Sequence, residues 1–195
     1  KMTMTVPRSV GQVPVTYNHR TGSGYCITSD SFVSAIFSGG YVDEDNRPLF
    51  CFGHGLSYTS FELSDFRIEE TTVSTSGKIV VSVKVKNTGE REGDEVVQLY
   101  YHTKKAHVIR PVKQLAGFKR ISLEAGEEKT VIFTLDTAQL GYYNEDMEFV
   151  VEPTVMDIMV GTSAHHIHFS GEVRLSGEKR SVMGRRIFTC NVAVE

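Results

Sequence analysis

The chain has 195 residues, of which 40% are hydrophobic and 23% are charged, and its formal net charge at pH 7 is −3. These proportions are normal for a soluble globular chain, and the length allows one large domain with appendages. The nearly balanced charge argues against a nucleic-acid partner, because such partners select a clearly basic face. No apolar run approaches the ~18–20 residues of a membrane span, so a membrane partner is not expected either.

The N-terminus and the cysteines bear on the cellular compartment. Lys1–Val6 lacks the apolar stretch and small-residue cleavage site of a secretory signal, and a first residue other than Met indicates a piece of a longer chain. Cys26, Cys51 and Cys190 are odd in number, far apart and without zinc-type spacing. They are typical of structural thiols, which favours a cytoplasmic over a secreted location only slightly. The localisation stays unknown at this point.

Alternating apolar residues dominate from about residue 61 to residue 175. The clearest stretch is KIVVSVKVK at 78–86, where every second residue is Ile or Val and the opposite face is more polar. This period of two predicts a half-buried strand. The same pattern predicts strands at 61–69, 95–101, 112–123 with an interruption at Gly117, 129–135, 148–151, 155–160 and 169–175.

Helical periodicity is nearly absent. Only 136–140 is suited to a single helical turn, with Asp136 as its N-cap. Seven or eight short strands separated by turn signals predict an all-β, immunoglobulin-like sandwich, in which two sheets bury their apolar faces against each other. The predicted core contains Val81, Val83, Val85, Val97, Leu99, Val131, Phe133 and Leu135.

The two ends of the chain differ from this middle region. In residues 1–52, glycines and prolines separate short apolar stretches, which indicates the end of another domain plus a connector. Its apolar residues need shelter, so this extension is expected to fold back onto the sandwich or to form a homodimer. Those residues are Val13, Val15, Phe32, Val33, Ile36 and Phe37. The tail at 177–195 begins with basic residues, and its alternation at 187–194 predicts one extra strand.

Groups suited to catalysis or metal binding are sparse. Glycoside hydrolysis needs two carboxylates about 5–9.5 Å apart, but the acidic residues at 43–45 are typical of a solvated turn. His165, His166 and His168 form the sequence HHIH, in which two could share a strand face, yet a third metal ligand at fixed spacing is missing. An enzyme that uses either feature is the weakest alternative. No catalytic, metal or cofactor-binding residue is assigned.

Aromatic residues offer a different function. Sugars stack on exposed rings, which present a large flat apolar face. The chain has no Trp, and Tyr100, Tyr142 and Tyr143 are the candidate sugar contacts. A carbohydrate-binding module that tethers an enzyme to polysaccharide, with an oligosaccharide as ligand, is therefore the main alternative. Tyrosines in sandwich strands more often serve core and edge packing.

Several separated motifs carry a resemblance to a known family. They are PLFCFGHGLSYT at 48–59, NTGEREGDEVVQLYYH at 87–102, RPVKQLAGFKRISLEAGEEKTVIFTL at 110–135 and LGYYNED at 140–146. In this order they resemble the C-terminal part of glycoside hydrolase family 3, the β-glucosidase group. VPRSVGQVPVTYNH at 6–19 resembles the closing segment of that family's second, α/β sandwich domain. The usual form of the first motif is PFGHGLSYT, and Cys51 stands in place of its Pro.

The resemblance implies both an organisation and a function. Residues 1–52 are expected to be the end of the α/β sandwich domain plus a connector, 53–176 a fibronectin type III-like sandwich, and 177–195 a C-terminal tail. The family's nucleophile is an Asp on an N-terminal barrel, and its acid/base is usually a Glu upstream of the PRSVGQ-like stretch. No residue of this chain matches either. The resemblance implies a non-catalytic accessory module that packs against the catalytic domains of a retaining β-glycosidase.

The first motif also has a structural interpretation of its own. Gly53 and Gly55 let the chain turn where a Cβ would clash. Phe52, Leu56 and Tyr58 are expected to anchor the connector against neighbouring domains.

The later motifs are expected to shape strand entries. Gly89 and Gly93 allow a tight or bulged link into the next strand, and Arg110-Pro111 imposes an extended entry. Gly117 marks a bulge before Phe118. The full set of family-motif positions is Phe52, Gly53, His54, Gly55, Leu56, Ser57, Tyr58, Asn87, Gly89, Gly93, Arg110, Pro111, Gln114, Leu115, Gly117 and Phe118.

Overall fold

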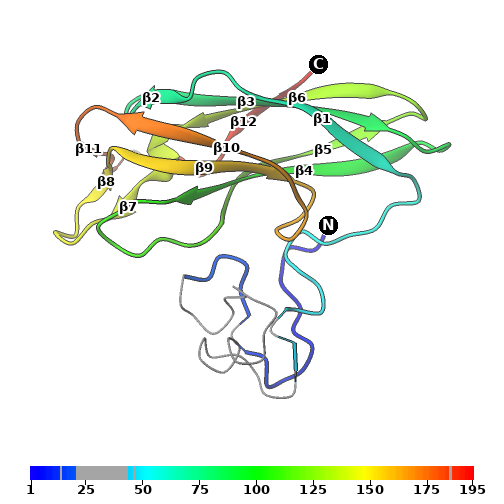
Figure 1. Ribbon diagram of the computed structural model, residues 1–195, viewed down its shortest axis with the longest axis horizontal. Helices are drawn as coiled ribbons and strands as arrows, with labels where there is room; N and C mark the ends of the chain where they lie inside the picture. Colours follow the sequence, from blue (N-terminus) through cyan, green and yellow to red (C-terminus); the bar gives the residue numbers. More distant parts are fainter. Residues whose placement is uncertain (14, 21–43, 46, 185) are drawn as a thin grey trace.

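The computed structural model describes residues 1–13, 15–20, 44–45, 47–184 and 186–195. Over this part of the chain the regular structure is β-sheet, apart from one short 3-10 turn. Figure 1 shows two layers of strands that face each other, with the N-terminal segment leaving from one side. The all-β sandwich expected from the sequence is confirmed.

The strands follow one another with short links. In chain order they are β1 (Phe61–Ile68), β2 (Thr72–Ser74), β3 (Lys78–Asn87), β4 (Gly93–Thr103), β5 (Gln114–Leu123), β6 (Glu128–Asp136), β7 (Tyr142–Tyr143), β8 (Phe149–Val151), β9 (Thr154–Gly161), β10 (Ile167–Ser176), β11 (Arg180–Ser181) and β12 (Asn191–Val194), with the 3-10 turn η1 (Thr137–Leu140) after β6. A four-stranded sheet has the order β1-β3-β6-β12, and a five-stranded sheet has the order β2-β10-β9-β4-β5. A small sheet, β11-β8-β7, lies at one end (Figure 1).

Alternating residues from the inner faces of the two main sheets fill the space between them. In the antiparallel register of β3 and β6, Val81 lies opposite Phe133 and Val83 lies opposite Val131. All of the residues predicted for the core are completely shielded from solvent. Each such side chain contributes about 1.5–3 kcal/mol relative to an exposed position, so this layer is the main source of stability.

Every predicted strand is present, with ends that differ by a few residues. The single turn is also confirmed, because Asp136 caps η1 by accepting a 2.9 Å hydrogen bond from the backbone N–H of Ala138. The sequence missed β2, β7 and β11, since strands of 2 or 3 residues are too short to show alternation. The extra strand predicted in the tail is β12, which pairs with β6 and extends the four-stranded sheet.

The expected interruption at Gly117 is a bulge in β5. Leu99 lies opposite Gly117 while Tyr100 lies opposite Leu115, which leaves Ala116 as the extra residue. A Cβ on Gly117 would lie 2.7 Å from the Cβ of Cys190. Glycine is needed here because the tail that leads into β12 crosses β5 at close range.

Part of the N-terminal extension lies outside the described residues. Val15 is buried and Val13 is largely exposed. The remaining residues expected to need shelter, Phe32, Val33, Ile36 and Phe37, fall in the undescribed range 21–43. The homodimer through this extension and the domain boundaries at 52 and 176 stay predictions. Where the chain is described, it forms no helix long and apolar enough to cross a membrane.

Candidate domain-docking site

The segment at 48–60, which we call the connector, is paired with the N-terminal residues before it reaches β1. The Val6 N–H donates to the Phe50 carbonyl at 2.8 Å, and the Leu49 N–H donates back to the Val6 carbonyl at 2.9 Å. Further along, the Gly53 N–H donates to the Met2 carbonyl at 2.8 Å. The connector is therefore one side of a short backbone ladder rather than a free tether.

Aromatic rings attach this ladder to the outer face of the five-stranded sheet. Tyr17 stacks on Phe52 with ring centroids 4.3 Å apart, and its edge meets the ring of Tyr100 on β4 at 6.0 Å. The Ala164 N–H donates to the Phe52 carbonyl at 2.9 Å, and the Leu115 N–H donates to the Tyr17 hydroxyl at 3.3 Å. Burial raises the pKa of Tyr17 and of Tyr100, so both phenols stay neutral.

A buried glutamine occupies the centre of this contact. Gln98 on β4 is 3% exposed, and its side-chain amide donates to the Thr162 carbonyl at 2.7 Å while its oxygen accepts from the Tyr100 hydroxyl. Gly53 lies directly above it with a φ of +79°, and a Cβ there would lie 2.3 Å from the Gln98 side-chain oxygen. A glycine is thus required at position 53 for two reasons: its φ is positive, and a Cβ would overlap the Gln98 side chain.

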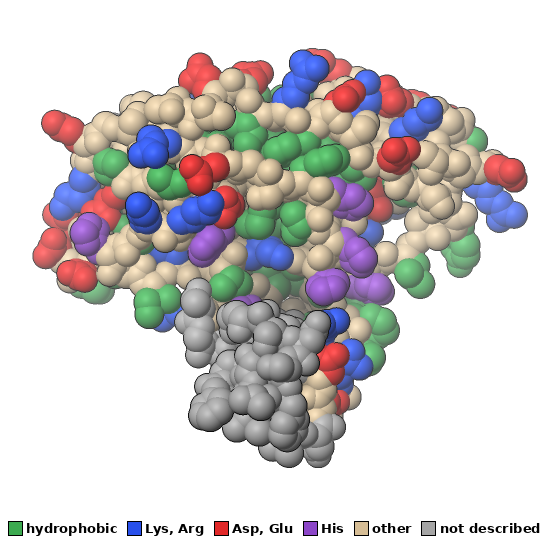
Figure 2. Space-filling model, viewed as in Figure 1, with side chains coloured by type: hydrophobic (Ala, Val, Ile, Leu, Met, Phe, Trp, Pro, Cys, Tyr) green, Lys and Arg blue, Asp and Glu red, His purple; other side chains and the backbone are tan. Residues whose placement is uncertain are grey.

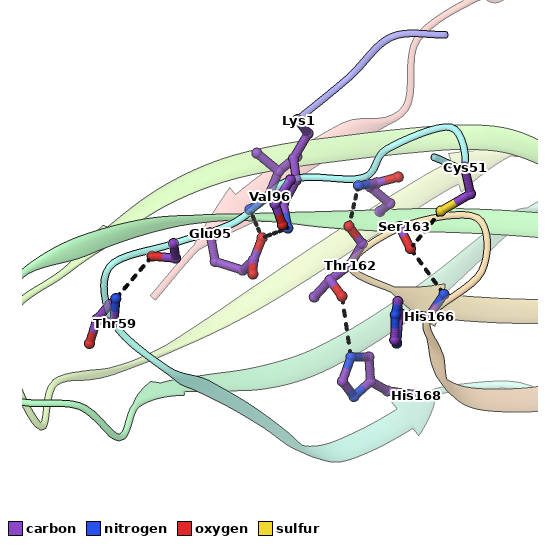
Figure 3. A network of polar contacts seen from close by, with 12 residues as sticks. Lys1, Cys51, Thr59, Glu95, Val96, Thr162, Ser163, His166 and His168 are labelled. Carbon is purple, nitrogen blue, oxygen red and sulfur yellow. Dashed lines mark hydrogen bonds and ion pairs between the residues drawn. The ribbon is translucent and has the colours of Figure 1, made fainter. Parts of the chain in front are cut away.

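We call this contact between Gly53 and the buried Gln98 the Gln98 lock. Figure 3 shows the polar contacts next to it. The Lys1 ammonium pairs with the Glu95 carboxylate at 2.9 Å, and Glu95 also accepts from the Val96 N–H at 2.6 Å. Ser163 accepts from the His166 N–H at 3.0 Å and lies 3.5 Å from the Cys51 sulfur. The Lys1–Glu95 pair holds the N-terminus to β4, and the Cys51–Ser163 contact joins the connector to the turn between β9 and β10.

A second set of hydrogen bonds holds the end of the connector at Thr59. The Thr59 hydroxyl donates to the Asn87 side-chain oxygen at 2.7 Å, and the Asn87 amide donates to the carbonyls of Arg91 and Leu123 at 2.7 and 3.0 Å. A Cβ on Gly89 would lie 2.2 Å from the Thr59 hydroxyl oxygen, and one on Gly93 would lie 2.5 Å from its methyl group. Both glycines make room for Thr59, a reason that the sequence alone did not reveal.

The remaining positions of the first motif divide into partly buried and exposed ones. The ring of His54 stacks on Phe50 at 4.9 Å, and a Cβ on Gly55 would lie 2.9 Å from the Lys1 side chain. Leu56 and Tyr58 are 93% and 97% exposed. Of the residues expected to anchor the connector against other domains, Phe52 therefore packs inside this chain, whereas Leu56 and Tyr58 touch almost nothing in it.

Arg110 and Pro111 contact residues of β7 and β4. The Arg110 guanidinium lies 4.4 Å from the centroid of the Tyr142 ring, and the Tyr142 hydroxyl donates to Glu152. The Pro111 carbonyl lies 2.8 Å from a ring nitrogen of His102. Gln114 and Leu115 open β5, and Phe118 further along that strand is 62% exposed.

Two of the three candidate sugar contacts are buried. Tyr100 is completely buried beside Tyr17, and Tyr142 is 8% exposed beneath Arg110, so neither ring has a face free for a sugar. Tyr143 is 41% exposed, with the Arg186 guanidinium 5.5 Å from its ring centroid. Three tyrosines therefore do not form a sugar-stacking platform.

Two histidines of the HHIH motif, His165 and His166, lie in the turn between β9 and β10, and His168 lies on β10. The His165 and His166 rings are 5.6 Å apart and perpendicular, and a ring nitrogen of His168 lies 3.4 Å from the Thr162 hydroxyl. Burial, followed by the charge of His166, lowers the pKa of His165 and of His168. Among the described residues, no three His, Cys, Asp or Glu side chains are grouped closely enough to hold a metal ion.

Neither the acidic cluster nor the cavity beside Tyr17 presents, among the described residues, a pair of carboxylates arranged for hydrolysis. Asp43 lies outside the described residues, while Glu44 accepts from the Ser9 hydroxyl at 2.5 Å and Asp45 accepts from the Arg47 N–H at 2.8 Å. A cavity of about 520 Å³ beside the Tyr17 ring has no Asp or Glu among the described residues that line it. Figure 2 shows acidic and basic side chains interspersed over the face of the sandwich that is seen in that view.

Comparison with known proteins defines the class. Residues 95–164 match the family model described as a fibronectin type III-like domain. The chain is 41% identical over 168 residues to the periplasmic β-glucosidase of Salmonella typhimurium, covering 86% of this chain and 21% of that one. It is 47% identical over 156 residues to the thermostable β-glucosidase B of Acetivibrio thermocellus, covering 80% of this chain and 20% of the relative.

A solved structure gives the same result. The β-glucosidase from Listeria innocua in complex with glucose matches with a TM-score of 0.82 and 36% identity, over 90% of this chain and 24% of that chain. The protein is thus a fibronectin type III-like sandwich with a docked connector. Its resemblance to the C-terminal region of glycoside hydrolase family 3 is confirmed, and it spans about a fifth of the length of the curated relatives it matches.

Proposed function

We propose that this chain is a non-catalytic accessory module of a β-glucosidase-type glycosidase, which packs against the catalytic domains and stabilises them. The observation that carries the proposal is the docked connector. The Gln98 lock and the Tyr17–Phe52 stack hold it to the sheet. A connector attached in this way presents any domain upstream of it in one orientation, which a flexible tether would not do.

The acidic groups near the connector are suited to structure rather than to catalysis. A glycosidase needs a general acid with a raised pKa beside a second carboxylate. Hydrogen bonds from Ser122 and Arg120 instead lower the pKa of Asp94. Glu95, on the other side of the connector, is paired with Lys1. The cleavage of terminal β-D-glycosides is therefore assigned to the longer enzyme and not to these residues.

Assay of the purified chain with p-nitrophenyl β-D-glucoside tests this proposal. We expect no release of nitrophenol above the buffer blank, because no Asp or Glu is among the described residues that line the cavity beside Tyr17, and in the hollow that holds Glu92 and Asp94 the pKa of Asp94 is lowered rather than raised. Turnover that survives a second purification at constant specific activity would contradict the proposal. A contaminating glycosidase would instead be lost on repurification.

Affinity electrophoresis tests the carbohydrate-binding alternative. The chain is run in native gels with and without soluble β-glucan, next to a protein that does not bind sugars. Equal mobility in both gels is expected, because Tyr100 and Tyr142 are buried. Retardation that Tyr143→Ala abolishes would show that the alternative is correct.

A further inference from the structure

Three large apolar side chains that belong to the family motifs take no part in the core or in the contacts that hold the connector to the sheet. Leu56, Tyr58 and Phe118 are 93%, 97% and 62% exposed. Single exposed apolar residues are common on protein surfaces and need no explanation. These three differ because they gather on one face of the molecule.

The register of β4 and β5 places them together. Phe118 lies opposite Gln98, and Arg120 lies opposite Val96, all on the outer face of the five-stranded sheet. Leu56 and Tyr58 line an open hollow of about 400 Å³ together with Val96 and Arg120. Since residues two apart on a strand are about 7 Å apart, Phe118 adjoins this hollow. We call Leu56, Tyr58 and Phe118 the outer patch.

The backbone beneath the outer patch is held firmly. The Thr59 N–H lies 3.4 Å from the Ser57 hydroxyl, and the Thr59 side chain is bonded to the buried Asn87. Phe118 lies on β5 after the bulge, where β5 pairs with β4 without interruption. Docking onto a surface whose backbone is already ordered costs little conformational entropy, which favours a stable contact.

We propose that the outer patch packs against an apolar surface of the catalytic domains in the same polypeptide. This inference rests on the proposed function, and two observations support the choice of occupant. The relatives in which this chain forms about a fifth of the length provide a large body of protein outside it. The patch is also continuous with the connector, which leads to those domains. The Asp94–Arg120 ion pair at its edge provides the polar rim that such interfaces have.

Site-specific photo-crosslinking in the full-length glycosidase tests this inference. p-Benzoylphenylalanine replaces Tyr58 or Phe118 in separate variants, and it replaces Met147 as the control, since Met147 is 71% exposed and lies between β7 and β8 of the small sheet. We expect intramolecular crosslinks from both patch positions to peptides of the catalytic domains, and none of these from Met147. Crosslinks between copies, or no crosslinks from the patch positions, would overturn the inference.

Hydrogen exchange provides a second measurement that does not depend on a reactive probe. Amides at 114–123 and 55–59 should exchange about tenfold more slowly in the full-length enzyme than in the isolated chain, as expected for residues that become part of a packed interface. Phe118→Asp should remove that difference while leaving the far-UV spectrum of the isolated chain unchanged. Equal exchange in the two proteins would contradict the inference.

The inference and the proposed function can fail separately. If the isolated chain hydrolyses glucosides, the proposed function is wrong. If the chain is inactive and breaking the connector contact destabilises the full-length enzyme, but the patch positions do not crosslink to the catalytic domains, then only the outer patch has been misassigned.

Discussion

The two faces of β4 are equally buried, but they are buried by different partners. On the inner face, Val97 and Leu99 pack into the sandwich core. On the outer face, Gln98 and Tyr100 are covered by the connector and by Tyr17. A single isolated sandwich needs only the first of these contacts. The second holds the connector and Tyr17 against the sheet, and the predictions below test how far the two faces are independent.

The largest effect is expected from the inner face. Phe133→Ala should lower the free energy of unfolding of the isolated chain by about 3–5 kcal/mol, because it leaves a cavity between the two sheets. Urea denaturation followed by circular dichroism measures the change. Phe118→Ala is the matched control and should stay within about 0.5 kcal/mol, since that ring is mostly exposed. Similar losses for the two variants would show that the core is misidentified.

The next effect is expected at Gly53, and the chain provides a matched control for it. Gly53 and Gly126 both have a φ of +79°, but a Cβ on Gly126 meets nothing within 4 Å. Gly126→Ala should cost about 1–2 kcal/mol through backbone strain alone. Gly53→Ala should cost about 1–3 kcal/mol more, because the new methyl group overlaps Gln98.

Urea unfolding gives the two totals, and hydrogen exchange at Ala164, whose N–H donates to Phe52, locates the change. Faster exchange at Ala164 is expected for Gly53→Ala and not for Gly126→Ala. Equal losses in the two glycine variants would mean that the approach of Gly53 to Gln98 has no energetic consequence.

The inner face was predictable from the sequence, and most of the outer face was not. Alternation along β3, β4 and β6 is a local pattern, so the core residues could be identified without knowing the partner strands. Gln98 occupies a polar position in the alternation of β4, so the sequence alone predicts that its side chain faces solvent. Its burial depends on Gly53 and Thr162, which are distant in sequence, and no local signal predicts their meeting.

The motif glycines illustrate the same limit. The sequence correctly identified Gly53 as a position where a Cβ would clash, because the dense glycine spacing in the first motif is a local signal. It assigned Gly89 and Gly93 to turn geometry, whereas both stand where Thr59 approaches. Tyr100 and Tyr142 were considered as sugar contacts because the residues that cover them, Tyr17 and Arg110, lie elsewhere in the chain.

A smaller effect is expected from the hydroxyl group of Tyr100. Tyr100→Phe keeps the ring packing but removes the donor to Gln98, which leaves a buried amide oxygen with one partner fewer. The loss should be about 1–3 kcal/mol by urea denaturation. A double variant with Gln98→Met should lose less than the sum of the two single variants. Full additivity would argue that the two side chains act independently.

The smallest effect is a dependence on pH at the edge of the outer patch. Ser122 and Arg120 lower the pKa of Asp94 in the folded chain. Its contribution to stability is therefore present above the unfolded-state pKa of about 4 and is lost as the pH falls through the lower, folded-state value. Asp94→Asn should be slightly less stable than the parent chain at pH 6, and this difference should shrink below about pH 4. A difference that does not change with pH would contradict the assignment.

The most direct test of the whole account is Phe52→Ala in the full-length glycosidase, with Phe188→Ala as the control. Phe52 supplies the ring and the carbonyl that dock the connector, and it is not assigned any part in catalysis. Thermal inactivation and kcat/KM at low temperature are measured on the same preparations. The account predicts a lower inactivation temperature with an unchanged kcat/KM for Phe52→Ala only. A fall in kcat/KM with unchanged thermal inactivation would contradict it.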